Sequence, residues 1–250
     1  MDLDGRVAVV TGGTRGVGAG IAQAFLRAGA TVVVCARRPP EVPLPGVEFA
    51  PLELRDPDAV EEFFGGVVAR HGRLDVLVNN AGGTPYRLLG EGEAARHARV
   101  IELNLVAPLT ASLAAYGHLK VTRGSIVMIG SVSGGRPSPG SAAYGAAKAG
   151  LENLARSMAV EWAPEVRVNT LVLGMVRTEL SALHYGDEDG IAAVGRTVPL
   201  GRLAEPSEIG DAAVFLASQR AAYVSGASLL LHGGGERPAF LDAATVNKET

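Results

Sequence analysis

Short runs of β-branched residues alternate with longer alanine-rich segments along the whole chain, and this alternation constrains the fold most strongly. The short runs are apolar almost throughout, which is typical of strands buried on both faces of a parallel sheet. The segments between them are long enough to form helices that return the chain to the start of the next strand. The sequence therefore predicts an α/β fold, with a doubly wound, mostly parallel sheet covered by helices on both faces.

Seven strands and five helices are expected. The strands are expected at 7–10, 31–35, 47–50, 76–78, 125–129, 166–172 and 228–231. The helices are expected at 17–28, 57–70, 93–118, 143–162 and 206–217. Asp56 and Pro57 supply an N-cap and a proline at the first helical position for one of them. Since no linker or shift in composition divides the chain, a single domain over residues 1–250 is the simplest interpretation.

The segment near 176–202 has no clear periodicity, so we expect a mobile substrate-loop insertion over the carboxyl edge of the sheet. Its acidic run, Asp187 to Asp189, is expected to be a solvated loop face. His184 and Tyr185 in this insertion are candidates for contact with a substrate. Neither a calcium-loop spacing nor a paired-histidine helix is present in the sequence, and no metal site is expected.

Charge and cysteine content exclude several classes of protein. The formal net charge is −3 with the two signs interspersed, so the chain has no basic surface for nucleic acid. The amino terminus lacks an apolar signal core, and no segment reaches ~18 uninterrupted apolar residues. Cys35 is the single cysteine and lies within an apolar run, which indicates a buried structural thiol. We expect a soluble, cytoplasmic protein with neither nucleic acid nor membrane as a partner.

A glycine-rich stretch joins the first predicted strand to the first predicted helix. Gly12, Gly16 and Gly18 allow a tight turn and a close approach of backbone to a ligand. The free amides and the positive end of the helix dipole can then bind a pyrophosphate. The sequence predicts a dinucleotide site here, with a glycine-rich turn that binds nothing as the alternative.

Tyr144 and Lys148 stand four residues apart in a stretch predicted to be helical, with Ser131 upstream. Residues at this spacing share one face of a helix, so the Lys148 ammonium can favour ionisation of the Tyr144 phenol. A phenol titrates near ~10, and acid/base work at neutral pH needs a lower pKa. The pair indicates a proton-transfer site, although a surface tyrosine beside a solvated lysine has the same spacing.

These motifs, with the run Asn79 to Gly82 after a strand and with Asn104, resemble the short-chain dehydrogenase/reductase family in order and separation. The resemblance covers nearly the whole chain. It implies a Rossmann-type dinucleotide-binding fold, a nicotinamide cofactor, hydride transfer to or from a small molecule, and assembly into homotetramers or homodimers.

The resemblance also implies catalytic roles. Tyr144 would give a proton to a carbonyl oxygen or take one from an alcohol, and Ser131 would hold the substrate oxygen. Ser133 competes for that place, but the family's spacing to the tyrosine selects Ser131. Lys148 would lower the pKa of the tyrosine and bind the nicotinamide ribose. Asn104 would anchor a water chain to the lysine, with a structural asparagine that satisfies helix backbone as the alternative.

Cofactor choice depends on the end of the second predicted strand. An acidic residue there would bind the ribose diol of NAD, whereas this chain has Ala36 followed by Arg37 and Arg38. Together with Arg15 these guanidinium groups suit the 2′-phosphate of NADP. NADP is therefore favoured over NAD, and ordinary solvated surface charges are the alternative interpretation.

The cofactor contacts implied by the resemblance come from the glycine-rich turn, from the chain after four other strands and from the helix that carries Tyr144. They are Gly12, Thr14, Arg15, Gly16, Val17, Gly18, Arg37, Arg38, Glu53, Leu54, Asn80, Ala81, Gly82, Tyr144, Lys148, Gly174, Val176 and Thr178. Glu53 stands where the family more often has aspartate, near the adenine amino group. Leu173 replaces the proline that usually precedes Gly174, which leaves that turn less defined.

The resulting prediction is an NADP(H)-dependent reductase of ketones, or dehydrogenase of secondary alcohols, with an apolar substrate such as a 3-oxoacyl thioester or a steroid-like ketone. The alternatives are an NAD-dependent hydroxy-compound dehydrogenase and a non-catalytic NADP-sensing module. Enoyl reduction is disfavoured because it ordinarily has a wider spacing of tyrosine and lysine. The tail at 233–250 is expected to cross to a neighbouring subunit.

Overall fold

A seven-stranded sheet in the order β3-β2-β1-β4-β5-β6-β7 forms the centre of the molecule in this computed structural model, which describes residues 2–246. The strands are β1 Val7–Thr11, β2 Thr31–Ala36, β3 Val47–Pro51, β4 Val76–Asn79, β5 Ser125–Ser131, β6 Arg167–Leu173 and β7 Ser228–Leu231. All neighbouring strands run parallel. The predicted doubly wound sheet is confirmed, and the sheet is parallel throughout.

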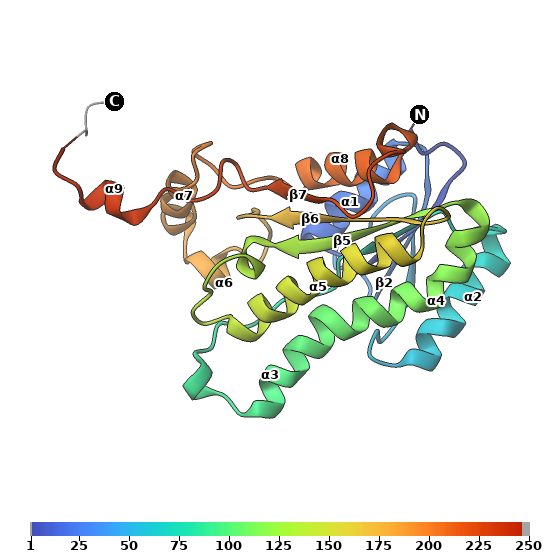
Figure 1. Cartoon of the computed structure of the whole chain (residues 1–250), viewed down its shortest axis with the longest axis horizontal. Helices are drawn as coiled ribbons and strands as arrows, with labels where there is room; N and C mark the ends of the chain where they lie inside the picture. Colours follow the sequence, from blue (N-terminus) through green and yellow to red (C-terminus); the bar gives the residue numbers. More distant parts are fainter. Residues whose placement is uncertain (1, 247–250) are drawn as a thin grey trace.

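Helices cover both faces of the sheet. One layer contains α1 (Gly16–Arg27) and α8 (Pro206–Ala217), and the other contains α2 (Pro57–His71), α4 (Ala107–Thr122) and α5 (Ala142–Glu161). Figure 1 shows the first layer above the strands and the second below them. Successive residues of each strand face opposite layers, so each layer packs on its own apolar core.

The strand order places a crevice at the carboxyl edge of the sheet. From β1 the chain proceeds outward through β2 to β3, and it then returns to β4 on the other side of β1. The loops that follow β1 and β4 therefore diverge, which is where open α/β sheets bind ligands. The glycine-rich turn and Asn80 both lie at this point.

The predicted helix at 93–118 is a longer stretch with an irregular centre. It comprises α3 (Ala94–Ile101), a π-helical turn η2 (Glu102–Val106) and α4. Its length and mean hydropathy of 1.3 would suit a membrane span. One side of α4, including Ala111 and Leu119, is instead buried against the sheet, as in the core helix of an α/β domain.

The segment near 176–202 is more regular than predicted. It contains α6 (Ala182–Tyr185) and α7 (Glu188–Thr197). The Asp187 carboxylate accepts a hydrogen bond from the Gly190 amide at 3.0 Å and caps α7. The acidic run is exposed, as predicted, but it forms a helix start, where negative charge is favoured by the helix dipole, and not a loop.

Beyond β7 the chain leaves the body of the molecule. Figure 1 shows α9 (Ala239–Ala243) at the left end, beyond α7, where Phe240 and Leu241 are exposed. The last residues of the predicted subunit-crossing tail, 247–250, lie outside the described part of the chain. Three short 3₁₀ turns, η1 (Leu89–Glu91), η3 (Val132–Gly134) and η4 (Gln219–Ala221), complete the elements.

Candidate active site

The glycine-rich turn is packed so closely that side chains cannot enter it. Gly12 has φ +63°, and a Cβ there would lie 2.9 Å from Ala81 Cα. A Cβ on Gly18 would overlap the Gly12 carbonyl oxygen. These glycines therefore bring the β1–α1 turn against the chain that follows β4 and leave bare backbone at the crevice.

The amino-terminal end of α1 provides hydrogen-bond donors at this bare backbone. Within the described chain, neither a side-chain cap at Arg15 nor an acidic residue in the first turn satisfies these amides. The Gly16 and Val17 amides belong to this first turn, and the helix dipole makes the end electropositive. The turn is thus suited to bind an anion such as a pyrophosphate.

Asn80 and Thr11 hold the turn in place. The Asn80 side-chain amide donates to the carbonyl oxygens of Thr11 at 2.9 Å and Gly12 at 3.1 Å. The Thr11 hydroxyl accepts from the amides of Asn80 and Ala81, each at 3.0 Å, and donates to the Val78 carbonyl. Thr11 was not among the predicted site residues, although a hydroxyl at the end of an apolar strand was a usable signal.

The chain after β6 closes the other side of the crevice. A Cβ on Gly16, which has φ +52°, would lie 3.3 Å from Thr178 Cγ2, so the two predicted contact residues face each other. A Cβ on Gly174 would lie 2.8 Å from His232 Cα in the chain after β7. This close approach requires glycine at position 174, even though Leu173 replaces the usual proline. Val176 pairs with Ala204 in an isolated bridge.

Ser131 and Tyr144 meet at the carboxyl end of β5. Ser131 ends the strand, and Tyr144 lies in the first turn of α5. Burial raises the pKa of Tyr144, and the nearby Ser131 hydroxyl opposes this rise. Ser131, and not Ser133, is thus the serine that acts on the phenol; the Ser133 amide donates to the Ser131 hydroxyl at 3.2 Å.

Lys148 lies one helical turn after Tyr144 and is 3% exposed. Its ammonium donates to the Ile129 carbonyl at 2.7 Å and lies 5.4 Å from the centre of the Tyr144 ring. Burial lowers the pKa of Lys148 to about 8. The predicted lowering of the Tyr144 pKa is not seen in this structure, because burial of the phenol outweighs the influence of its neighbours.

Asn104 lies in the π-helical turn η2 and binds backbone. Its Oδ1 accepts from the Gly83 amide at 2.9 Å, and its Nδ2 donates to the carbonyls of Gly83 and Val100. A Cβ on Gly82 would lie 2.5 Å from Asn104 Oδ1 and 3.6 Å from Lys148 Nζ. Asn104 therefore stands beside the lysine across Gly82, and a π-turn at this place is typical of a functional site.

The chain ends after β2 and β3 lie side by side at the far end of the crevice. Arg37 and Arg38 are exposed, and the Leu52 amide donates to the Ala36 carbonyl at 3.0 Å. Glu53 pairs with Arg55, and this pair lowers the pKa of Glu53 to about 2. Sequence reasoning missed Arg55. The usable signal was a basic residue, Arg55, two positions after the predicted acidic contact Glu53.

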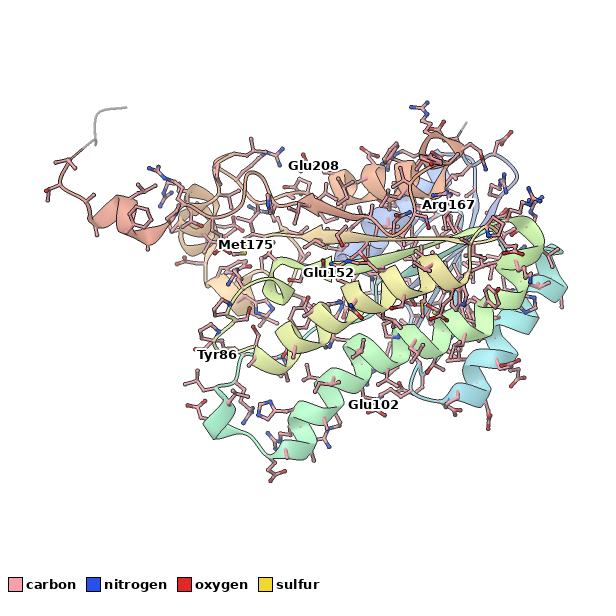
Figure 2. The ribbon with its side chains drawn as sticks, in the orientation of Figure 1. Tyr86, Glu102, Glu152, Arg167, Met175 and Glu208 are labelled. Carbon is pink, nitrogen blue, oxygen red and sulfur yellow. The ribbon has the colours of Figure 1, made fainter. Side chains whose placement is uncertain are left out.

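Tyr185, Arg136 and Glu236 form a polar wall at the carboxyl edge of the sheet. The Tyr185 hydroxyl donates to Met175 Sδ at 3.3 Å, and an ion pair of 2.6 Å joins Arg136 to Glu236. The pair connects the loop after β5 with the chain after β7. Figure 2 shows Met175 and Tyr86 at the same end of the sheet as α6. His184, the other predicted substrate contact, is exposed.

Known proteins resemble this chain over most of its length. The model of a family described as enoyl-(acyl carrier protein) reductase matches residues 12–236. L-fucose dehydrogenase of Oryctolagus cuniculus is 37% identical over 243 residues, which cover 93% of this chain and 85% of the relative. The 3-oxoacyl-[acyl-carrier-protein] reductase FabG of Vibrio cholerae is 36% identical over 243 residues, with 94% and 98% covered.

Solved structures share the fold. Ligand-free aldohexose dehydrogenase (AldT) of Thermoplasma acidophilum superposes with a TM-score of 0.89 at 28% identity, covering 100% of this chain and 98% of that one. A protein described as a short chain dehydrogenase/reductase family member gives a TM-score of 0.82 at 34% identity, with 94% and 99% covered.

Proposed function

The chain belongs to the short-chain dehydrogenase/reductase family, and on that premise we propose that it interconverts ketones and secondary alcohols with NADP(H). Members of this family are oxidoreductases that act on CH–OH and carbonyl groups, so the finer claims are the substrate, the cofactor preference and the residue roles. The observation that carries the proposal is the meeting of Ser131, Tyr144 and Lys148 at the carboxyl end of β5.

The crevice fits a nicotinamide dinucleotide. Bare glycine backbone and the free start of α1 suit the pyrophosphate, and Asn80 fixes the turn that presents them. Gly82, Val176 and Thr178 border the part of the crevice near Lys148 and Gly16. When bound, this cofactor supplies or accepts the hydride.

Ser131 and Tyr144 bind the substrate oxygen in the proposed mechanism. Their hydroxyls are neutral donors placed together, so both can bond to a carbonyl oxygen that becomes negative as the carbon is reduced. The raised pKa of Tyr144 keeps the phenol protonated at neutral pH. Tyr144 Oη then gives its proton to that oxygen, and it accepts the proton back during alcohol oxidation.

Lys148 supports this transfer with positive charge. Its ammonium is present below a pH of about 8, and it lies over the Tyr144 ring, where it favours any negative charge that develops on the phenol oxygen. Both hydrogens of the Asn104 amide are used by backbone, while Oδ1 retains a lone pair. We propose that this lone pair receives a water on the path to Lys148.

The preference for NADP rests on charge. Ala36 leaves the end of β2 without a carboxylate, and Arg37, Arg38 and Arg15 are exposed cations on the adjoining loops. An exposed guanidinium that meets a phosphate can form a bidentate, charge-assisted pair. NAD remains the alternative cofactor.

The proposed substrate is an apolar ketone such as a 3-oxoacyl thioester or a steroid-like ketone, in line with the name of the FabG relative. Two observations support the alternative substrate, a hydroxy compound. Relatives are named for fucose and aldohexose, and a polar wall is formed by Arg136, Glu236 and Tyr185. The family description names enoyl reduction, but the Tyr144–Lys148 spacing argues against that reaction.

One panel of assays tests these choices. The protein is incubated with NADPH or NADH and with 3-oxoacyl thioesters, cyclic ketones, enoyl thioesters and, in the reverse direction, aldoses. We expect ketone reduction with NADPH and no reduction of the enoyl thioesters. Tight NADPH binding without turnover of any substrate would support the non-catalytic alternative, and faster turnover of aldoses with NAD would support the hydroxy-compound dehydrogenase.

Assembly and location complete the proposal. We propose a cytoplasmic homotetramer or homodimer with a small-molecule substrate and no nucleic-acid or membrane partner. An exposed apolar side of α4 and the preceding turn η2, which includes Val106, Leu113 and Val121, supports a subunit contact. The exposed Phe240 and Leu241 on α9 support a second contact, in which the tail crosses to a neighbouring subunit.

A further inference from the structure

A two-pronged ion pair occupies the end of the crevice where the strands β2 and β3 stop. Arg55 Nε donates to Glu53 Oε1 at 3.0 Å, and Arg55 Nη2 donates to Glu53 Oε2 at 2.8 Å. The Arg55 amide adds a third bond to Oε1 at 3.2 Å. Both oxygens of the Glu53 carboxylate are therefore oriented by one residue.

The pair lies close to the cationic residues proposed to select the cofactor. β2 and β3 run side by side, with Ala36 opposite Pro51, so the chain ends that carry Arg37 and Glu53 are neighbours. Arg37 also contributes, after Arg55, to the low pKa of Glu53. With a pKa of about 2, Glu53 is negative at every pH at which the enzyme would work.

An unpaired Glu53 carboxylate would weaken the binding of the NADP 2′-phosphate in two ways. The Glu53 carboxylate would attract the Arg37 guanidinium away from a phosphate, and it would repel that phosphate directly. Arg55 removes both effects because it satisfies the carboxylate with its own fork of donors. A lysine could neutralise the charge but could not hold both oxygens in one plane.

We propose that Arg55 is a specificity-determining residue for NADP over NAD, acting through Glu53 as a positioning residue. It keeps the carboxylate paired, so that Arg37 and Arg38 remain free to bind the 2′-phosphate. The inference rests on the proposed use of NADP, but it concerns a change in the ratio of two affinities. That ratio can be measured whichever nucleotide the wild type prefers.

The test compares the dissociation constants of NADPH and NADH by nucleotide fluorescence titration. In Arg55→Ala we expect the NADPH affinity to fall roughly fivefold to tenfold, as one unbalanced charge near the surface predicts, and the NADH affinity to stay within about twofold. In Glu53→Gln/Arg55→Ala the ratio of NADPH to NADH affinity returns to that of the wild type, because the unbalanced carboxylate is gone and any loss of the adenine contact affects both nucleotides equally. Arg55→Lys gives an intermediate ratio, and kcat at saturating NADPH is unchanged in Arg55→Ala.

Arg202→Ala is the matched control. Arg202 also binds both oxygens of one glutamate, Glu208, through Nη1 and Nη2 at 2.7 Å each, and holds the pKa of that glutamate at about 2. Its removal should leave the ratio of affinities unchanged. An unchanged ratio in Arg55→Ala, an equal loss of both nucleotides, or a double variant whose ratio equals that of Arg55→Ala would overturn the inference. A wild type that prefers NADH would instead refute the NADP proposal.

Discussion

Tyr144 and Lys148 are ionisable groups that burial drives toward their neutral forms. Burial raises the pKa of the phenol and lowers that of the ammonium to about 8, so the two pKa values move apart. At neutral pH the phenol therefore keeps the proton that it would donate, while the lysine can still carry its positive charge. The physical cost is a buried polar cluster, which stabilises the fold less than apolar side chains would.

The first prediction concerns the proton donor. Tyr144→Phe keeps the ring and its packing but removes the proton, so ketone reduction should fall by at least about 10²-fold. The dissociation constant of NADPH should stay within about threefold, since the nucleotide turn is untouched. Steady-state assays and a nucleotide titration on the same preparation check both numbers. Retention of most of the activity would remove Tyr144 from the mechanism.

The second prediction concerns the stability cost of Lys148. Its pKa is about 8 in the folded protein against an ordinary value of 10.5 for a lysine, so below pH 8 folding must bury a charge. Lys148→Met should therefore stabilise the protein on the order of 1–3 kcal/mol at pH 7, less the lost bond to the Ile129 carbonyl, while activity disappears.

The sign of the pH dependence follows from the same values. Between pH 8 and 10.5 the native lysine is neutral while the unfolded chain still binds the proton, so wild-type stability rises with pH. The advantage of Lys148→Met should shrink across this window. Urea unfolding at a series of pH values checks it, and an advantage that stays constant would show that the charge is not buried in the native state.

Most candidate site residues could be predicted because each follows a strand at the same edge of the sheet. Thr11 and Arg55 were missed despite their signals, since their importance lies in contacts with residues that have their own predicted roles. Asn104 was predicted by resemblance, and the structure adds that its amide binds the Gly83 and Val100 backbone. The shift of the Tyr144 pKa was predicted with the wrong sign, because spacing along a helix reports proximity and not burial.

At the scale of elements, the glycine-rich turn and α1 form one unit whose shape is set by close backbone contacts. Asn80 connects this unit to β4, and Gly16 brings it to Thr178. The shape of the turn is therefore fixed by the chain after three strands, β1, β4 and β6. A residue that enlarges it should disturb nucleotide binding and folding together.

The third prediction compares two glycines. Gly18→Ala places a Cβ against the Gly12 carbonyl and within 2.5 Å of Asn80 Nδ2, so it should cost about 1–3 kcal/mol and weaken nucleotide binding. Gly65→Ala is the control, since a Cβ on this α2 residue meets nothing within 4 Å. It should stabilise the protein by about 0.5–1 kcal/mol and leave binding intact. Equal effects of the two variants would contradict the contacts described for the turn.

Elements with strong periodicity were predicted well, and short ones were not. Seven apolar runs and five helices sufficed for the sheet and its two layers. The helices α6 and α7 were not predicted because they are too short to show a repeat of apolar residues. The cap by Asp187 was present in the sequence but was interpreted as part of a solvated loop.

At the scale of the whole molecule, the strand order places every candidate residue at one edge. Strands β1, β4, β5 and β6 are neighbours, so loops distant in sequence converge on one crevice. Sequence order alone could not give this arrangement. It required the rule that crossovers between parallel strands are right-handed, together with the reversal of strand order at β1.

The fourth prediction concerns assembly. Figure 1 shows α9 away from the body of the molecule, and its exposed Phe240 and Leu241 are apolar. A chain that ends at Gly235 should form a smaller assembly, measured by light scattering after size-exclusion chromatography. Phe240→Ser/Leu241→Ser in the full chain should do the same without shortening the tail. Unchanged assembly size in both variants would refute a tail that crosses between subunits.

The most direct test of the central claim follows a labelled hydride. NADPH carrying deuterium at both C4 positions is incubated with the best ketone from the panel, and the alcohol product is analysed by mass spectrometry and NMR. The proposed mechanism predicts deuterium on the carbinol carbon with the wild type and no labelled product with Tyr144→Phe. Product without deuterium on that carbon, or undiminished labelling by Tyr144→Phe, would contradict it.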